Sequence, residues 1–186
     1  TTITYGTALS AAQLNATASV PGTFVYTPAL DTVLNAGSSQ TLHVDFTPMS
    51  TADYNTASKD VTITVNKGTL TITADNKTNQ YGTGLPTLTA SYSGFVNGDT
   101  ASSLDTAVIL TTTTTLASSI GTYPITASAA SDANYTVTFV AGTMTVTKRE
   151  IIITVNSGVP NPSLVGQAYV VSWTTSITES GIGTPS

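Results

Sequence analysis

One segment, Asn134–Val155 (NYTVTFVAGTMTVTKREIIITV), constrains the fold of this chain more than any other. Its pattern predicts two short strands that close one module, followed without a break by the first strand of the next. An earlier segment, Tyr54–Ile72 (YNTASKDVTITVNKGTLTI), has the same pattern. Four identical pairs are separated by 81 positions: Tyr54 and Tyr135, Val65 and Val146, Lys67 and Lys148, Ile72 and Ile153. Matches at one offset without an insertion predict an internal structural repeat.

The rest of the chain predicts an all-β fold of tandem immunoglobulin-like β-sandwich modules in an elongated array. Short alternating runs separated by Gly, Pro, Asn and Asp recur about every ten residues, which is typical of sandwiches and barrels. Thr makes up roughly a fifth of the residues, and its branched β-carbon favours strands over helices. No segment has convincing apolar spacing of helical period over three turns.

Eleven strands are predicted in the first two modules. In the first they are Thr2–Tyr5, Leu14–Ser19, Thr23–Thr27, Gln40–Thr47 and Ser58–Val65; in the second they are Thr69–Ala74, Thr87–Ser93, Ala107–Leu116, Tyr123–Ser128, Tyr135–Val140 and Thr143–Thr147. Alternation predicts that Val61, Ile63 and Val65 face the interior of the first module, and that Leu70 and Ile72 face the interior of the second. Ala141-Gly142 is expected to form a two-residue hairpin turn. Gly6 and Gly82, in matching Tyr-Gly-Thr-x-Leu segments, are expected in a backbone conformation closed to a β-carbon.

The predicted domains are 1–67, 68–148 and a partial module, 149–186. The third segment has predicted strands at Ile151–Val155 and Ala168–Ser176, with a Pro-rich turn at Val159–Pro162 between them. Thirty-eight residues of strands bury little apolar surface alone. We therefore expect this module to be incomplete, or to be completed by a strand from another chain.

The connections between modules are short. Asn66-Lys67-Gly68 separates the first two modules, and Thr147-Lys148-Arg149-Glu150 separates the next pair. A strand that continues almost directly into the next strand holds modules end to end, whereas a Gly/Ser tether lets them tumble. The sequence therefore predicts a stiff rod with small contacts between modules.

Composition excludes several classes of function. The net charge is -5, and only five Lys and Arg are present, which argues against nucleic-acid binding. There is no Cys, so disulfides, thiolate metal sites and Cys nucleophiles are excluded. No apolar run approaches the ~20 residues of a membrane span.

The segment Leu70–Lys148 closely resembles the MBG-type repeats of large bacterial surface proteins, over about residues 69–148. The shared motifs are Asp75-Asn76-Lys77, Tyr81-Gly82, Gly94-Phe95-Val96-Asn97-Gly98-Asp99, Gly121-Thr122-Tyr123-Pro124-Ile125 and Asn134-Tyr135. The first module, with PGTFVYTPA, LNAGSSQTLHVDFTP and ADYNTA, resembles a bacterial immunoglobulin-like repeat. The third segment, with NPSLVGQAYVVSWT, is similar to the opening of another such type. The resemblance implies an extracellular location and a stalk or adhesin role, and it brings no catalytic residues.

No residue type in this chain makes a strong catalytic, cofactor or metal site, so none is predicted. His43, the sole His, is expected on the solvent face with Asp45, and no activated Ser accompanies it. No acid sits in a context that suggests the carboxylate pair of a glycosidase. Asp75 with Asn76, or Asn97 with Asp99, could bind calcium at a module junction, but turn residues bonded to their own backbone are favoured.

The remaining candidates also have simpler structural interpretations. Intramolecular isopeptide bonds from Lys59, Lys67 or Lys77 are disfavoured against solvated lysines, because the reaction needs a buried amine. Packing in the core, of the tyrosine-corner kind for Tyr54 and Tyr135, is favoured over sugar stacking; Trp173 is likewise expected in the core. Thr111–Thr115 is expected to be a strand with exposed hydroxyls.

The leading functional hypothesis is mechanical: a rod, stalk or filament of a bacterial surface or secreted protein. Its partners would be neighbouring modules or chains of the same protein, with a possible cell-surface glycan or protein ligand. One alternative is a glycan- or ligand-binding adhesin module. A second is a filament subunit assembled by β-strand donation. An enzyme is not expected.

Overall fold

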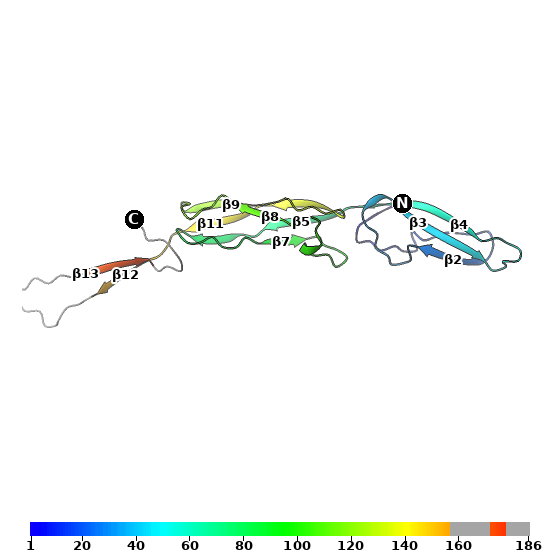
Figure 1. Ribbon diagram of the computed structural model, residues 1–186, viewed down its shortest axis with the longest axis horizontal. Helices are drawn as coiled ribbons and strands as arrows, with labels where there is room; N and C mark the ends of the chain where they lie inside the picture. Colours follow the sequence, from blue (N-terminus) through cyan, green and yellow to red (C-terminus); the bar gives the residue numbers. More distant parts are fainter. Residues whose placement is uncertain (157–171, 178–186) are drawn as a thin grey trace, which may run out of the picture.

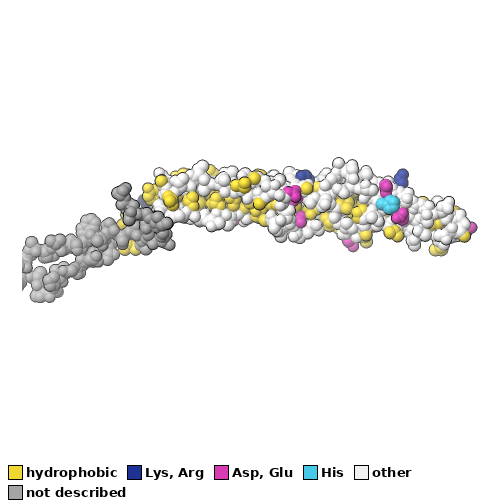
Figure 2. Space-filling view, viewed as in Figure 1, with side chains coloured by type: hydrophobic (Ala, Val, Ile, Leu, Met, Phe, Trp, Pro, Cys, Tyr) yellow, Lys and Arg dark blue, Asp and Glu magenta, His cyan; other side chains and the backbone are white. Residues whose placement is uncertain are grey.

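The computed structural model describes residues 1–156 and 172–177 of the chain. These residues form an all-β molecule drawn out along one axis, with the strands of both modules running roughly along that axis (Figure 1). The only helical element described is a single 3-10 turn, η1 (Ala101–Ser103). Charged side chains are sparse on the face shown in Figure 2, where uncharged polar and apolar atoms dominate.

The first module contains one four-stranded sheet with the order β1-β4-β3-β2. Its strands are β1 (Thr2–Thr4), β2 (Gly22–Thr27), β3 (Gly37–Pro48) and β4 (Ala57–Asn66). The first strand runs parallel to the last, and the other pairs are antiparallel. Loop segments, joined by a single Ala8–Val33 bridge, cover the half of the sheet near the second module, where Leu9, Leu14 and Leu34 are buried.

The second module contains two sheets, ordered β10-β5-β7 and β6-β11-β9-β8. Its strands are β5 (Gly68–Ala74), β6 (Lys77–Gln80), β7 (Ala90–Ser93), β8 (Ile109–Thr112), β9 (Gly121–Ser128), β10 (Tyr135–Val140) and β11 (Gly142–Thr147). Leu70, Ile72, Ile125 and Met144 are each fully buried. The alternation that placed Leu70 and Ile72 inward is therefore confirmed, and burial of such side chains stabilises each by about 1.5–3 kcal/mol.

A parallel ladder runs the whole length of the second module. β5 pairs with β10 from Gly68↔Tyr135 to Thr73↔Val140, and β6 pairs with β11 from Lys77↔Met144 to Gln80↔Thr147. The register is the same in the two pairs of strands, although each of the two paired segments passes from one sheet to the other between them. The change is tight, because a β-carbon on Gly142 would collide with the carbonyl oxygen of Ala74. Ala141-Gly142 is thus a crossing between sheets, and the predicted hairpin turn is wrong.

The connection between the first two modules is almost unbroken strand. β4 ends at Asn66 and β5 begins at Gly68, so only Lys67 lies outside a strand. Three residues separate β11 from β12 (Ile151–Asn156), which pairs antiparallel with β13 (Ser172–Ile177). The predicted short, extended connections are confirmed. The predicted turn Val159–Pro162 and the first part of the predicted strand Ala168–Ser176 lie outside the described residues, as does the side chain of Trp173.

The first module repeats only one of the two sheets of the second. The order β1-β4-β3-β2 corresponds to β6-β11-β9-β8, with the same parallel and antiparallel pairs. No described strand of residues 1–67 corresponds to β10-β5-β7. The two-sheet sandwich expected for the first module is therefore not what these strands form.

Several local predictions fail, in both modules. Leu14–Ser19, predicted as a strand, is a turn followed by irregular chain. Val61 is 52% exposed although it lies on the inward face of β4. In the second module β6 was not predicted, and β7 and β8 are shorter than predicted. The positive φ angles expected at Gly6 (91°) and Gly82 (74°) are confirmed.

Candidate functional site

A carboxylate links the two modules. Asp99, in the loop after β7, accepts hydrogen bonds through Oδ2 from the hydroxyl of Tyr5 in the first module (2.9 Å) and of Tyr135 in the second (2.8 Å). Both tyrosines are buried, at 7% and 3% exposure. A charged acceptor makes stronger hydrogen bonds than a neutral one. One side chain therefore fixes a residue from each module; we call this contact the joint.

Aromatic packing makes the hydrophobic core continuous through the joint. The rings of Tyr5 and Tyr135 meet edge to face with centroids 5.4 Å apart, and Phe95 meets Tyr135 in the same manner at 5.6 Å. Such pairs contribute about 0.5–1.5 kcal/mol each beyond their buried area. The buried residues of both modules form one cluster. Core packing therefore extends across this junction, which the sequence did not predict.

Backbone turns and polar contacts complete the joint. Thr4-Tyr5-Gly6-Thr7 forms a turn closed by a hydrogen bond from the Thr7 amide to the Thr4 carbonyl, with Gly6 packed against Val96. Asn134 Oδ1 accepts a hydrogen bond from the amide of Ala36 (2.9 Å). The ammonium group of Lys67 donates to the carbonyl oxygen of Asp132 (3.0 Å). The amide, ammonium and carboxylate contacts together hold the second module against the first.

The protonation of Tyr135 suits this contact. Burial, together with the Asp99 carboxylate, raises the pKa of Tyr135 to about 12. Its phenol therefore stays protonated and can donate to Asp99 over the whole physiological pH range. The hydroxyl also accepts a hydrogen bond from the amide of Val96 (3.0 Å). The predicted core role of Tyr135 is confirmed, whereas Tyr54 is 52% exposed and its predicted core role is wrong.

The residues considered as calcium ligands bond elsewhere. Asp75 accepts hydrogen bonds from the hydroxyls of Ser91 (2.6 Å) and Thr89 (2.5 Å), which lower the pKa of its carboxyl group. Asn76 Oδ1 accepts from the amide of Thr143 (2.7 Å). The sequence had suggested that these side chains bond the backbone of their own turns. Instead, the side chains of Asp75, Asn76 and Asp99 connect different strands or modules. Within residues 1–156 and 172–177, no group of three or more His, Asp or Glu is arranged to hold a metal ion.

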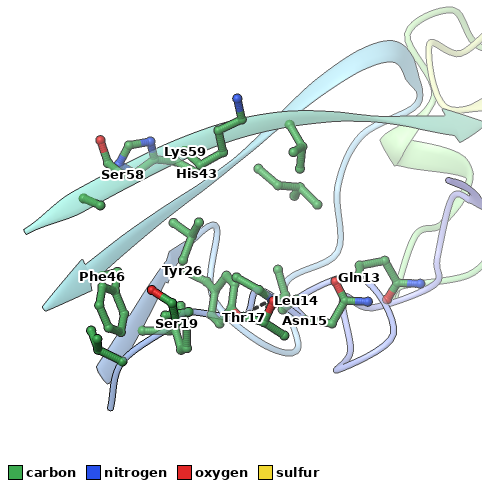
Figure 3. Close-up of a pocket in the computed structure, with 18 of the residues that line it drawn as sticks. Gln13, Leu14, Asn15, Thr17, Ser19, Tyr26, His43, Phe46, Ser58 and Lys59 are labelled. Atoms are coloured by element: carbon green, nitrogen blue, oxygen red, sulfur yellow. Dashed lines mark hydrogen bonds between the residues drawn. The ribbon is translucent and has the colours of Figure 1, made fainter. Parts of the chain in front are cut away.

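A groove of about 650 Å³ opens on the inner face of the first module's sheet (Figure 3). One wall is the segment 13–20, tied to the sheet by a hydrogen bond from the amide of Ala16 to the hydroxyl of Tyr26 (2.9 Å). The floor carries a row of three aromatic rings, in which Phe24 stacks on Tyr26 (centroids 6.3 Å apart) and packs at a tilt against Phe46 (4.9 Å). The other wall is the start of β4 and the residues before it, from Tyr54 to Val61. The sequence did not predict this groove, because the predicted β-sandwich has a second sheet packed against this face.

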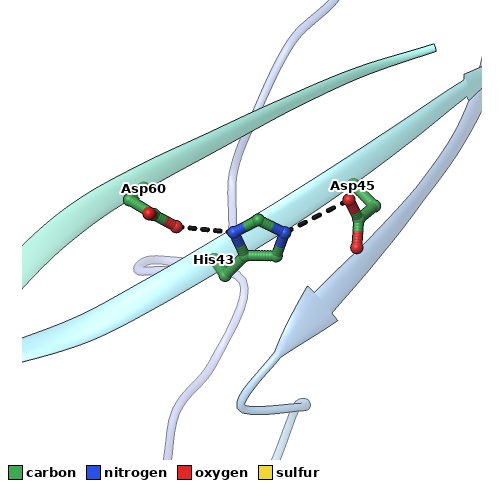
Figure 4. Close-up of polar contacts among 3 residues, drawn as sticks. All are labelled: His43, Asp45 and Asp60. Carbon is green, nitrogen blue, oxygen red and sulfur yellow. Dashed lines mark hydrogen bonds and ion pairs between the residues drawn. The ribbon is translucent and has the colours of Figure 1, made fainter.

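His43, which also borders the groove, lies between two carboxylates, those of Asp45 and Asp60 (Figure 4). Its Nδ1 is 2.5 Å from Asp60, its partner across β3 and β4, and its Nε2 is 3.1 Å from Asp45. The hydrogen bonds to Asp60 and Asp45 raise the pKa of His43. The partnership with Asp45 on the outer face agrees with the sequence, and Asp60 was missed because cross-strand register is not readable there.

We expect Asp60→Asn to lower the pKa of His43, because the substitution removes the closer negative charge. Since the folded-state pKa is raised, the stabilisation by protonated His43 is complete below its ordinary value of ~6.5 and is lost as pH rises through the folded-state pKa. NMR titration of the imidazole measures the shift. Asp53→Asn, which changes an acid remote from His43, serves as the control; an unchanged His43 pKa in Asp60→Asn contradicts the assignment.

The remaining candidates have ordinary surroundings. Lys67 bonds a backbone carbonyl, as described above, and Lys59 lines the groove. Of the segment Thr111–Thr115, only Thr111 and Thr112 lie in a strand, and Thr114 is buried (3% exposed), so the predicted exposed strand is only partly correct. No helix among the described residues is long and apolar enough to cross a membrane.

Of the comparisons with known proteins, one finds a match, and the matched residues lie in the second module. No curated protein and no solved structure matches the chain. The family model of the MBG domain (YGX type) matches residues 70–145, a segment that includes Tyr81-Gly82-Thr83 and the Asp99 loop. The match suggests a repeat of a bacterial surface protein. The segment 70–145 is therefore similar to MBG domains of the YGX type.

Proposed function

We propose that this chain is a structural repeat region of a bacterial surface or secreted protein, a stiff extracellular rod that spaces or presents a binding tip. The observation that carries the proposal is the joint, where Asp99 holds buried tyrosines of both modules. A rod needs each connection to resist bending, and two contacts do so here: the nearly continuous strand at Lys67 and the joint beside it. The role we propose is therefore that of a spacer and not that of a catalyst.

The direction of the terminal strands supports a role under tension. The second module begins with β5 and ends with β11, and these ends are joined by two parallel ladders in the same register, β5 with β10 and β6 with β11. A force applied through the chain pulls the two parallel strands past each other. The ladder hydrogen bonds then resist together, whereas pulling from one shared end breaks them one after another.

Force spectroscopy on the Cys-free chain tests this proposal. Attachment at the chain termini is expected to require a higher force to unfold the second module than attachment through cysteines introduced at Gln80 and Thr147. These two residues face each other at the same end of the ladder, so the second geometry unzips it. Equal unfolding forces in the two geometries would count against a mechanical role.

A second candidate function is adhesive binding of a glycan or other ligand. The observation in its favour is the groove, which exposes a row of aromatic rings suited to stacking on sugars. Binding on a sugar array that Tyr54→Ala abolishes would support this function, and an array without any signal would remove it.

A further inference from the structure

We propose that the turn at Tyr81 and Gly82 is a second joint, in which the segment 178–181 (TESG) of the same chain covers Tyr81 and Glu179 accepts a hydrogen bond from its hydroxyl. The inference deepens the proposed structural role, because this contact stiffens the connection that follows the second module. The segment 178–181 lies outside the described residues. Its assignment as the partner follows from the construction of the turn, the direction of β13 and the repeat in the sequence.

The turn after β6 has the same construction as the turn after β1. In each, the tyrosine amide donates a hydrogen bond to the carbonyl oxygen of the last residue of the parallel partner strand, at 2.8 Å for Tyr5 and 3.0 Å for Tyr81. A second hydrogen bond runs from the amide two residues after the tyrosine to the carbonyl oxygen just before it, at 3.0 Å and 3.1 Å respectively. The glycine has a positive φ in both turns, 91° at Gly6 and 74° at Gly82. The backbone therefore places Tyr81 at the end of the second module as it places Tyr5 at the end of the first.

The two turns differ in what lies against them. Tyr5 is 7% exposed, whereas Tyr81 is 49% exposed. A β-carbon placed on Gly6 would collide with the loop after β7, whereas one placed on Gly82 would lie 3.8 Å from Nη1 of Arg149. Tyr81 thus offers a ring and a hydroxyl of the kind that the first joint buries. The guanidinium group beside the turn favours a partner that brings a carboxylate.

The pairing of β13 brings the chain back toward this turn (Figure 1). β13 runs antiparallel to β12, and its last residue, Ile177, is opposite Ile151, the first residue of β12. Three residues separate Ile151 from the end of β11, to which the Tyr81 amide is bonded. Fully extended, that connection spans at most about 14 Å, and the four residues 178–181 can span as much in return. The chain after β13 therefore starts within reach of Tyr81.

The loop that carries Asp99 reaches the first joint by the same path. β7 runs antiparallel to β5, and its last residue, Ser93, is opposite Thr71, near the start of β5. The chain leaves β7 toward the first module and brings Asp99 to the hydroxyl of Tyr5. β12 and β13 have the arrangement of β5 and β7, so the residues after β13 correspond to the loop after β7.

Glu179 is the acid that this segment supplies. It is the only Asp or Glu in the sequence after Glu150. At the offset of 81, Gly98 and Asp99 correspond to Glu179 and Ser180, so the acid is displaced by one position and its side chain is one methylene longer. A carboxylate accepts a stronger hydrogen bond from a phenol than a neutral hydroxyl does, which favours Glu179 over Ser180 as the acceptor.

Hydroxyl-radical footprinting of the full chain tests whether Tyr81 is covered, because it reports the solvent exposure of individual tyrosine rings. Tyr54 is the internal reference, since its exposure of 52% is close to the 49% of Tyr81. With the segment 178–181 against the turn, Tyr81 is expected to be oxidised several-fold more slowly than Tyr54. Equal rates, or a faster rate at Tyr81, overturn the proposal.

Substitutions in the same assay identify the acceptor. Glu179→Ala is expected to raise the oxidation rate of Tyr81 to that of Tyr54. The matched controls are Ser180→Ala, which removes the neighbouring hydroxyl, and Glu150→Ala, which removes the acid of the connection; both are expected to leave the Tyr81 rate unchanged. Protection that persists in Glu179→Ala, or that either control abolishes as well, overturns the proposal.

This assay is independent of the test of the proposed function. Force spectroscopy on the second module reads the resistance of its ladders, whereas footprinting reads the cover of one ring. A fully reactive Tyr81 defeats the second joint and leaves the mechanical role standing. Equal unfolding forces in the two pulling geometries defeat the mechanical role without bearing on the contact at Tyr81.

Discussion

Gly94→Ala is expected to destabilise the second module by roughly 2–4 kcal/mol, combining backbone strain with overpacking. Gly94 has a φ of 111°, which L side chains rarely adopt, and a β-carbon there would collide with the carbonyl oxygen of Thr69 in β5. Neither the strand nor the glycine can move away, because β5 is central in its sheet. Urea unfolding followed by circular dichroism measures the loss.

Gly98→Ala is the matched control for this substitution. Gly98 also has a positive φ (78°), but nothing lies within 4 Å of a β-carbon placed on it. It is expected to cost only the strain, about 1 kcal/mol. If both variants lower the free energy of unfolding by the same amount, the close approach of Gly94 to the Thr69 carbonyl oxygen does not constrain the loop that follows β7.

Asp99→Ala is expected to cost about 1–3 kcal/mol and to loosen the joint, because the buried hydroxyl of Tyr5 loses its acceptor. Tyr135 retains a contact with the carbonyl oxygen of Val96 (3.3 Å), so the larger effect falls on the first module. Spin labels on the two modules report the effect as a broader distribution of distances.

Asp53→Ala provides the comparison for Asp99→Ala. Asp53 is an exposed acid in the first module and bonds only to the nearby Ser50. It is expected to leave both stability and the distance distribution within error. A joint that stays as narrow in Asp99→Ala as in the unsubstituted chain would mean that the continuous strand alone sets its stiffness.

The sequence predicted the strands best where one face is buried by its own module. Leu70 and Ile72 follow the alternating pattern because β9 and β11 cover them. The same pattern in Val61 failed, because in the first module nothing covers that half of the sheet. Repeat matching failed at Tyr54 for the same reason. Identical residues 81 positions apart do not guarantee that a β5-like neighbour is present.

The joint could not be predicted from local sequence patterns, because its residues are far apart in the sequence. Asp99 and Tyr5 are separated by 94 positions, and the Asn97-Gly98-Asp99 motif suggested a simple turn. The turn is formed, and the Asp99 amide donates a hydrogen bond to the Val96 carbonyl oxygen. The side chain of Asp99, however, accepts a hydrogen bond from Tyr5 of the first module. The recurrence of Tyr-Gly after β1 and β6 was the available signal. Tyr81, which is 49% exposed, shows how this position looks without an Asp99 loop against it.

Small-angle X-ray scattering of the chain as a monomer distinguishes a rod of two modules from a compact globule. Two modules of about 40 Å each, placed end to end, predict a radius of gyration of about 25 Å or more. A compact globule of this length would have a radius of gyration of about 16 Å. We expect the larger radius of gyration, with the scattering profile of a rod; the smaller value would contradict the end-to-end arrangement of the modules.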